Sequence, residues 1–255
     1  MLGWTLGGFP SPNLEAVAET LACGSADEGM RRVAERRFGS SLAPCVVAAW
    51  RGFSAAFSEF PFNAGVLYSG PQQLGPANLL WAEPTGYHAS MVGFAYDDLD
   101  AWRAVYPPEV FTRQLAAVAK GFEQAQAGLA AAFQACRGQL TAEQKTAVAE
   151  ELGVGEAAAI HFRSAANQAR FIMARRRLQE AKLAADEQAA REELEGLLRA
   201  EIALARRLHA IQSRDSRIGF EASNQYYYVP VDLAEKVINC HDLLRRLEAR
   251  ALGGR

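Results

Sequence analysis

Apolar residues recur at alternating spacings of three and four between residues 108 and 214, with few glycines and no proline after Pro108. This spacing places apolar side chains on one face of a helix. In the first segment the stripe consists of Phe111, Leu115, Val118, Phe122, Ala125, Leu129, Ala132 and Cys136. Similar stripes follow in residues 156–183 and 194–211. The pattern predicts three long helices that cover one another in a bundle.

Shorter helices are predicted on either side of this bundle. Asn13 and Ser25 are cap residues for helices over about residues 13–21 and 25–38, the second with a capping box formed with Glu28 and an end at Gly39. Residues 42–59 and 142–151 carry further helical patterns, the latter bounded by glycines at 138, 153 and 155. Asp232 is the predicted cap of a last helix. Residues 1–5 resemble a short strand.

The stretch from residue 62 to residue 95 breaks the helical pattern with glycines and prolines. Residues 66–68, 79–81 and 91–92 are candidates for short extended pieces. Long connections in compact proteins are often functional, so we expect functional residues here. Asp97 and Asp98 are predicted to cap a short helix that Pro107 ends.

Composition describes a protein of ordinary globular type. The 255 residues are 50% hydrophobic and 22% charged, with a net charge of −2 and a pI near 6.1. Nucleic-acid binders usually carry a basic face, and this balance gives no reason to expect one. The basic run from Arg175 to Arg177 is interpreted as solvated helix surface. We expect two domains, an α/β and loop-rich region over residues 1–105 and a helical bundle over residues 106–255.

The sequence shows no pattern typical of a metal site, a cofactor site or a membrane span. The four cysteines, at positions 23, 45, 136 and 240, have no close spacing of a zinc or redox motif and are expected to be reduced and buried. No two histidines have the spacing of a helical metal-ligand pair, and no cofactor motif occurs. There is no apolar run of about 18 residues that would span a membrane. We therefore expect a soluble, cytoplasmic protein without metal or cofactor.

Five residues are candidates for ligand binding. Trp4 and Thr5 lie at a predicted strand-to-loop junction, where the indole could stack on a sugar ring, although a buried core tryptophan explains Trp4 equally well. Gln72 and Asn78 offer neutral hydrogen-bonding groups beside Tyr68 and Trp81 that suit hydroxyl groups. Glu83 precedes a proline in aromatic surroundings, and its role stays open. The tyrosine run 226–228 is expected mainly to seal the bundle.

Three stretches together resemble a known group of proteins. They are residues 3–14 (GWTLGGFPSPNL), 68–80 (YSGPQQLGPANLL) and 215–228 (DSRIGFEASNQYYY). They are similar to the C-terminal part of large bacterial proteins considered to be glycoside hydrolase-like. The resemblance implies a mainly α fold, in which a helical bundle follows a small α/β remnant equivalent to the last strand-helix unit of a (β/α)8 barrel.

The resemblance also implies a function. The chain would be the C-terminal part of a carbohydrate-active protein, contributing substrate-side loops and a helical support domain and taking an oligosaccharide as ligand. The catalytic carboxylates of such a barrel would lie before residue 1, so the catalytic residues are not identified here. A partner, either a missing N-terminal barrel or a second copy, is expected. The alternative is a non-catalytic helical interaction or scaffold protein.

Overall fold

The computed structural model describes residues 12–91, 93–221 and 225–253. These residues are mainly helical, which confirms the predicted fold class at that level. The elements in chain order are α1 (Pro12–Cys23), α2 (Ala26–Phe38), α3 (Ala43–Phe57), α4 (Ala64–Ser69), η2 (Pro71–Gln73), η3 (Gly75–Ala77), α5 (Leu99–Trp102), α6 (Pro108–Cys136), η4 (Arg137–Gln139), α7 (Ala142–Glu180), α8 (Ala184–Gln212), β1 (Phe220–Glu221), β2 (Gln225–Tyr226) and α9 (Pro230–Gly253).

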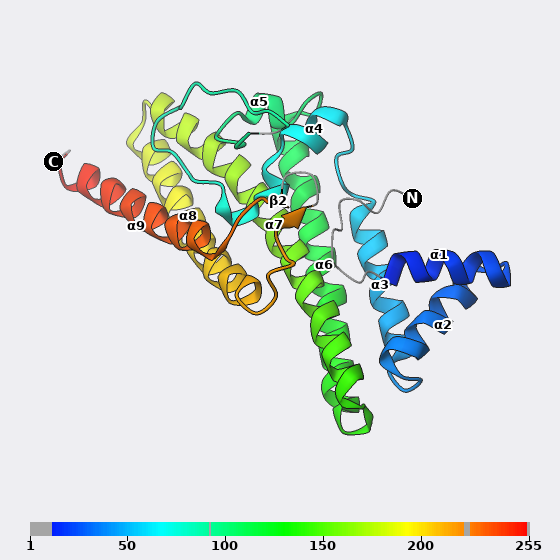
Figure 1. Ribbon diagram of the computed structural model, residues 1–255. Coiled ribbons are helices and arrows are strands. Elements are labelled where there is room, and N and C mark those ends of the chain that lie inside the picture. The colour runs from blue at the N-terminus through cyan, green and yellow to red at the C-terminus, as the bar shows by residue number, and fades with distance from the viewer. Residues whose placement is uncertain (1–11, 92, 222–224, 254–255) are drawn as a thin grey trace. The chain divides into compact units, whose positions relative to one another are not determined.

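The described residues form two compact units. Unit 1 contains those within Met1–Glu59, Ala117–Ala159 and Phe220–Gln225, and unit 2 contains those within Phe60–Ala116, Ile160–Gly219 and Tyr226–Arg255. Helices α6 and α7, which follow each other in the chain through η4, each contribute residues to both units (Figure 1). The expected division at residue 105 follows sequence composition, whereas these units follow contacts in space.

Unit 1 packs α2 and α3 against parts of α6 and α7. Its apolar core contains Phe38, Leu42, Val46, Leu129 and Val148, among others. Ion pairs join acidic side chains of α1 to arginines of α2, such as Glu19 to Arg36 and Glu15 to Arg37. Each such exposed pair stabilises a protein little.

Small residues let α3 and α6 of unit 1 approach closely. A Cβ atom added at Gly52 would lie 2.8 Å from the Cβ of Ala125, and one added at Gly121 would overlap the Cβ of Ala56. Real Cβ atoms do not approach this closely, so any larger side chain at these glycines must push the helices apart.

Unit 2 builds its core from α7, α8 and α9. Phe171 of α7, Leu194 and Leu198 of α8, and Leu243 and Leu244 of α9 lie in one buried cluster. Helices α8 and α9 carry the apolar spacing that predicted them, and they pack along each other. This core supports the irregular stretch between α4 and α6.

Two predictions of local secondary structure are wrong. Residues 66–68 are helical, because Asn63 caps α4 by accepting a hydrogen bond from the Gly65 amide at 2.9 Å. Residues 142–180 form one helix, without a break at Gly153 and Gly155. Gly155 is needed instead because the ring of Phe53 would lie 2.8 Å from an added Cβ atom.

The last helix begins at Pro230, three residues before the start that Asp232 as its cap would give. The carboxylate of Asp232 accepts a hydrogen bond from the amide of Val229 at 2.8 Å, so this side chain reaches back over the first turn. The predicted strand over residues 1–5 lies outside the described residues.

Candidate functional site

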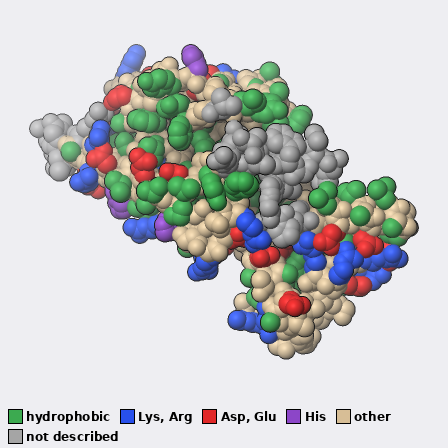
Figure 2. Space-filling view, viewed as in Figure 1, with side chains coloured by type: hydrophobic (Ala, Val, Ile, Leu, Met, Phe, Trp, Pro, Cys, Tyr) green, Lys and Arg blue, Asp and Glu red, His purple; other side chains and the backbone are tan. Residues whose placement is uncertain are grey.

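Exposed aromatic side chains mark one stretch of unit 2. Half of the large apolar side chains that are exposed in the described residues lie between Phe62 and Val105. Figure 2 shows green side chains at many points of the surface around α4 and α5. Monomeric soluble proteins seldom expose contiguous apolar surface without a role in binding. We call residues 81–98, with the exception of Val92, the aromatic loop.

The rings of the aromatic loop are stacked on one another. The ring centroids of Tyr87 and Tyr96 lie 5.0 Å apart at an interplanar angle of 26°, and Phe94 meets Tyr96 edge-on with centroids 6.1 Å apart. Tyr87 is 64% exposed and Phe94 is 60% exposed. These rings therefore present apolar faces and edges to solvent, and such surfaces can stack on flat, partly apolar ligands.

Two neighbouring carboxylates hold the aromatic loop together. Asp97 accepts hydrogen bonds from the amide and the hydroxyl of Thr85 and forms an ion pair with Arg175 at 2.8 Å. Asp98 accepts from the amide of Ala89 at 3.0 Å and caps α5 by accepting from the amide of Ala101 at 3.2 Å. Both carboxylates serve the loop itself.

These contacts correct two predictions. Asp98 caps the short helix as predicted, but Asp97 pairs with Arg175 instead. Arg175 is 4% exposed and also donates to the main-chain oxygen of Trp81, so its interpretation as solvated surface is wrong. Arg176 and Arg177 are exposed, as expected. A charge buried in this way requires a partner, which Asp97 supplies.

Beneath the loop, two buried side chains hold consecutive main-chain oxygens. The indole Nε1 of Trp102 donates to Ala95 at 3.0 Å, and the amide Nδ2 of Asn78 donates to Tyr96 at 2.8 Å. Trp102 is fully buried and Asn78 is 2% exposed. The loop therefore rests on the interior of unit 2 through fixed hydrogen bonds.

Asn78 belongs to a closed cycle of buried hydrogen bonds, which we call the polar ring. Its Nδ2 donates to Gln168 Oε1 at 2.7 Å, Gln168 Nε2 donates to Ser164 Oγ at 2.8 Å, and Ser164 Oγ donates to Glu201 Oε2 at 2.7 Å. Lys236 Nζ lies 3.2 Å from the same Glu201 oxygen and donates to the main-chain oxygen of Asn78. Side chains of Glu201 and Lys236 are fully buried, so each charge depends on the other.

A second buried contact joins His161 to Gln72 and Tyr228. His161 Nδ1 lies 2.7 Å from the main-chain oxygen of Gln72, which can only accept, so Nδ1 carries the proton. Nε2 then accepts from the hydroxyl of Tyr228 at 2.9 Å. Burial lowers the pKa of His161 to about 4 and raises the pKa of the Tyr228 phenol. Both groups are therefore neutral near pH 7, and the tyrosine run seals the core at Tyr228, as expected.

The structure describes three of the five predicted ligand residues. Trp4 and Thr5 lie outside the described residues. Gln72 is 8% exposed and donates to the main-chain oxygen of Val66 at 2.8 Å, while Asn78 is occupied by the polar ring. Glu83 is exposed in the aromatic loop and accepts from Gln179 at 2.9 Å. Among the described candidates, Glu83 is the one whose side chain reaches solvent.

Sequence reasoning did not single out the residues that shape this site. Tyr87, Phe94 and Tyr96 stand among glycines and prolines without periodicity, so no pattern marks them. Glu201 and Lys236 did leave a signal: each interrupts an otherwise apolar stripe, on α8 and α9 respectively, with charges of opposite sign. Opposite charges on two apolar helix faces indicate a buried pair.

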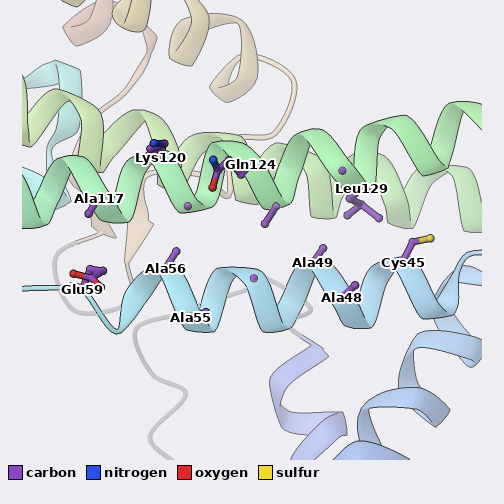
Figure 3. A pocket seen from close by; sticks show the side chains of 14 residues that line it. Cys45, Ala48, Ala49, Ala55, Ala56, Glu59, Ala117, Lys120, Gln124 and Leu129 are labelled. Atoms are coloured by element: carbon purple, nitrogen blue, oxygen red, sulfur yellow. The ribbon is translucent and has the colours of Figure 1, made fainter.

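Unit 1 contains a separate groove of about 780 Å³ between α3 and α6. Figure 3 shows that alanine side chains and glycines form most of its lining, with Glu59, Lys120 and Gln124 also there. Small side chains line the groove because the same residues allow α3 and α6 to approach closely. These residues contain no nucleophile-and-base arrangement.

Other kinds of site receive no support in the described part of the chain. No group of three or more histidine, cysteine, aspartate or glutamate residues there could hold a metal ion. No helix among those residues has the length and apolar character needed to cross a bilayer. Of the four free thiols, Cys240 is buried, which raises its pKa to about 12, whereas Cys45 is exposed, contrary to the expectation that all are buried.

Comparison with known proteins adds no family to this description. The sequence matches no family model and no curated protein, and the fold matches no solved structure.

Proposed function

We propose that this chain is the carbohydrate-binding, helical part of a glycoside hydrolase-like protein, and that the aromatic loop is its ligand surface. The observation that carries the proposal is the exposed stack of Tyr87 on Tyr96, with Phe94 at its edge. Sugar rings have apolar C–H faces, and the negative face of an aromatic ring attracts them. Tyrosine also loses little conformational entropy on binding.

Binding, and not hydrolysis, is the activity that we assign to these residues. Hydrolysis of a glycosidic bond requires two carboxyl groups on opposite sides of the bond. Asp97 and Asp98 are engaged in holding the loop, one by Arg175 and the other by main-chain amides. Glu83 is exposed in the same loop and is the group we propose to contact sugar hydroxyls. Trp4 and Thr5 stay proposed ligand residues through the resemblance alone.

Affinity electrophoresis and calorimetric titration with a panel of soluble polysaccharides test the proposal. We expect one class of polysaccharide to bind, and Tyr87→Ala to weaken its binding about tenfold, as loss of one aromatic contact predicts. Tyr226→Ala is the matched control, because Tyr226 is a 47% exposed tyrosine outside the aromatic loop. Equal affinity in wild type and Tyr87→Ala would exclude the aromatic loop as the ligand surface.

The alternative, a helical interaction protein, has one observation in its favour. Leu14, Val17 and Leu21 lie on one face of α1 and are 57%, 44% and 82% exposed. An apolar helix face of this kind is typical of a surface that packs on another chain. Assembly that depends on protein concentration in sedimentation experiments, with no response to any polysaccharide, would favour this alternative over carbohydrate binding.

A further inference from the structure

Tyr96 has a backbone conformation that its own side chain does not favour. Its φ of 51° lies in the left-handed region, which bulky residues rarely enter. A residue persists there when the surrounding structure fixes it, and such residues cluster at ligand sites. The same residue carries the ring that stacks on Tyr87 and meets Phe94. Whatever fixes the Tyr96 backbone therefore also sets the ligand-facing rings.

Asn78 is placed to fix that backbone. Its Nδ2 donates to the Tyr96 main-chain oxygen at 2.8 Å and to Gln168 Oε1 at 2.7 Å, so both amide hydrogens are used. The residue cannot easily turn away, because its own main-chain oxygen accepts from Lys236 and it is 2% exposed. Gln168 and Lys236 thus hold Asn78 directly, and Asn78 holds Tyr96.

We infer that Asn78 is a positioning residue for the aromatic loop: its buried amide sets the conformation of Tyr96 from behind, without touching the ligand. The effect on ligand binding rests on the proposed function, whereas the effect on loop conformation does not. This role replaces the direct contact with sugar hydroxyls that the sequence indicated for Asn78.

Hydrogen–deuterium exchange of the full chain, followed by mass spectrometry, tests the inference in Asn78→Asp. The ionised aspartate has nearly the same shape but no side-chain donor, so in that form it cannot donate to the main-chain oxygen of Tyr96. Ser164→Ala is the control, since Ser164 belongs to the same polar ring but bonds to Gln168 and Glu201, and Gln168 keeps its bond to the main-chain oxygen of Gly75. We expect exchange across residues 81–98 to accelerate at least tenfold in Asn78→Asp and to stay at the wild-type rate in Ser164→Ala.

Two results would overturn the inference. One is unchanged exchange in the aromatic loop of a folded Asn78→Asp protein. The other is an equal acceleration in Ser164→Ala, which would show that the polar ring stabilises unit 2 in general and that Asn78 has no special role. If the loop loosens in Asn78→Asp but no polysaccharide binds wild type, the positioning role stands and the proposed function fails. If the loop loosens and wild type binds, polysaccharide affinity should fall about tenfold in the variant.

A measurement on the wild type decides the case if Asn78→Asp does not fold. The amides of Thr85 and Ala89 donate within the loop to Asp97 and Asp98. If Asn78 holds the loop, its two side-chain amide protons and these two backbone amides exchange through the same opening, with the same dependence on urea in NMR experiments. Fast exchange of Thr85 and Ala89 while the Asn78 protons stay protected would refute the inference.

Discussion

The two units of this chain are stabilised inside by different means. In unit 1, glycine and alanine bring α3 and α6 together, and ion pairs at the surface join α1 to α2. In unit 2, a fully buried ion pair and amide side chains close a ring between α7, α8, α9 and the segment at Asn78. Asn78 connects this polar ring to the aromatic loop by donating a hydrogen bond to the main-chain oxygen of Tyr96.

The difference suggests why the candidate ligand surface lies in unit 2. Apolar packing of small residues joins regular helices closely but offers no directed groups to hold an irregular loop. Buried hydrogen bonds are directional, and each donor left without a partner costs free energy, so they specify one loop conformation. Three predictions test this contrast, from the largest expected effect to the smallest.

Replacing Lys236 should have the largest effect. In Lys236→Met the carboxylate of Glu201 stays buried without its cation, which typically costs about 3–5 kcal/mol of unfolding free energy. Urea denaturation followed by circular dichroism measures this loss. The double variant Lys236→Met/Glu201→Gln should recover part of it, because no unpaired charge is left inside.

Arg36→Ala is the matched control in unit 1. Arg36 pairs with Glu15 and Glu19 on the surface, and exposed pairs are worth about 1 kcal/mol or less. If Lys236→Met lowered the free energy of unfolding no more than Arg36→Ala, the buried ion pair of unit 2 would matter no more to stability than the surface pairs of unit 1.

The second prediction concerns the pH dependence that His161 contributes. Its folded-state pKa of about 4 lies below the ordinary value of 6.5, so between these values the unfolded chain binds a proton that the folded protein does not. Stability should therefore fall as pH is lowered from 6.5 to 4, by on the order of 3 kcal/mol. His161→Gln should remove this slope, as chemical denaturation at a series of pH values would show.

Glu151 of unit 1 has the opposite influence and serves as the comparison. Burial raises its pKa although Trp50 Nε1 donates to the carboxylate at 2.7 Å. Its stabilising contribution is complete below the ordinary pKa of 4.5 and is lost as pH rises through the folded-state pKa. A Glu151→Gln protein should keep the His161 slope. If the slope disappeared in Glu151→Gln instead, the pH dependence would come from unit 1 and not from His161.

The smallest effect is expected where α3 and α6 meet. A methyl group at position 121 would overlap the Cβ of Ala56, and overpacking of this kind costs about 1–3 kcal/mol. Gly121→Ala should therefore lower the melting temperature. Gly128→Ala lies on the same helix with nothing within 4 Å of the new Cβ atom, so it should be neutral or stabilising by up to about 1 kcal/mol. Equal effects of both variants would show that the close helix approach is not important.

Much of the helical framework was predictable, because it depends on local pattern. The apolar spacing placed α6, α8 and α9, and the capping box at Ser25 placed the start of α2. The predicted break at Gly155 failed because glycine marks a turn in most contexts, whereas here it makes room for the Phe53 ring, which is distant in sequence. Burial of Arg175 was missed for the same reason, since its partner Asp97 is far along the chain.

The sequence by itself determined where most of the long helices form and that they would be interrupted between residues 62 and 95, because helix periodicity and glycine or proline content act over a few residues. Only the tertiary structure decided which residues of that stretch reach solvent. It turned Gln72 and Asn78 inward and left Tyr87 and Phe94 outside. The physical reason is that a polar side chain can be buried only where partners from other elements meet it, and for Asn78 those partners lie on α7 and α9.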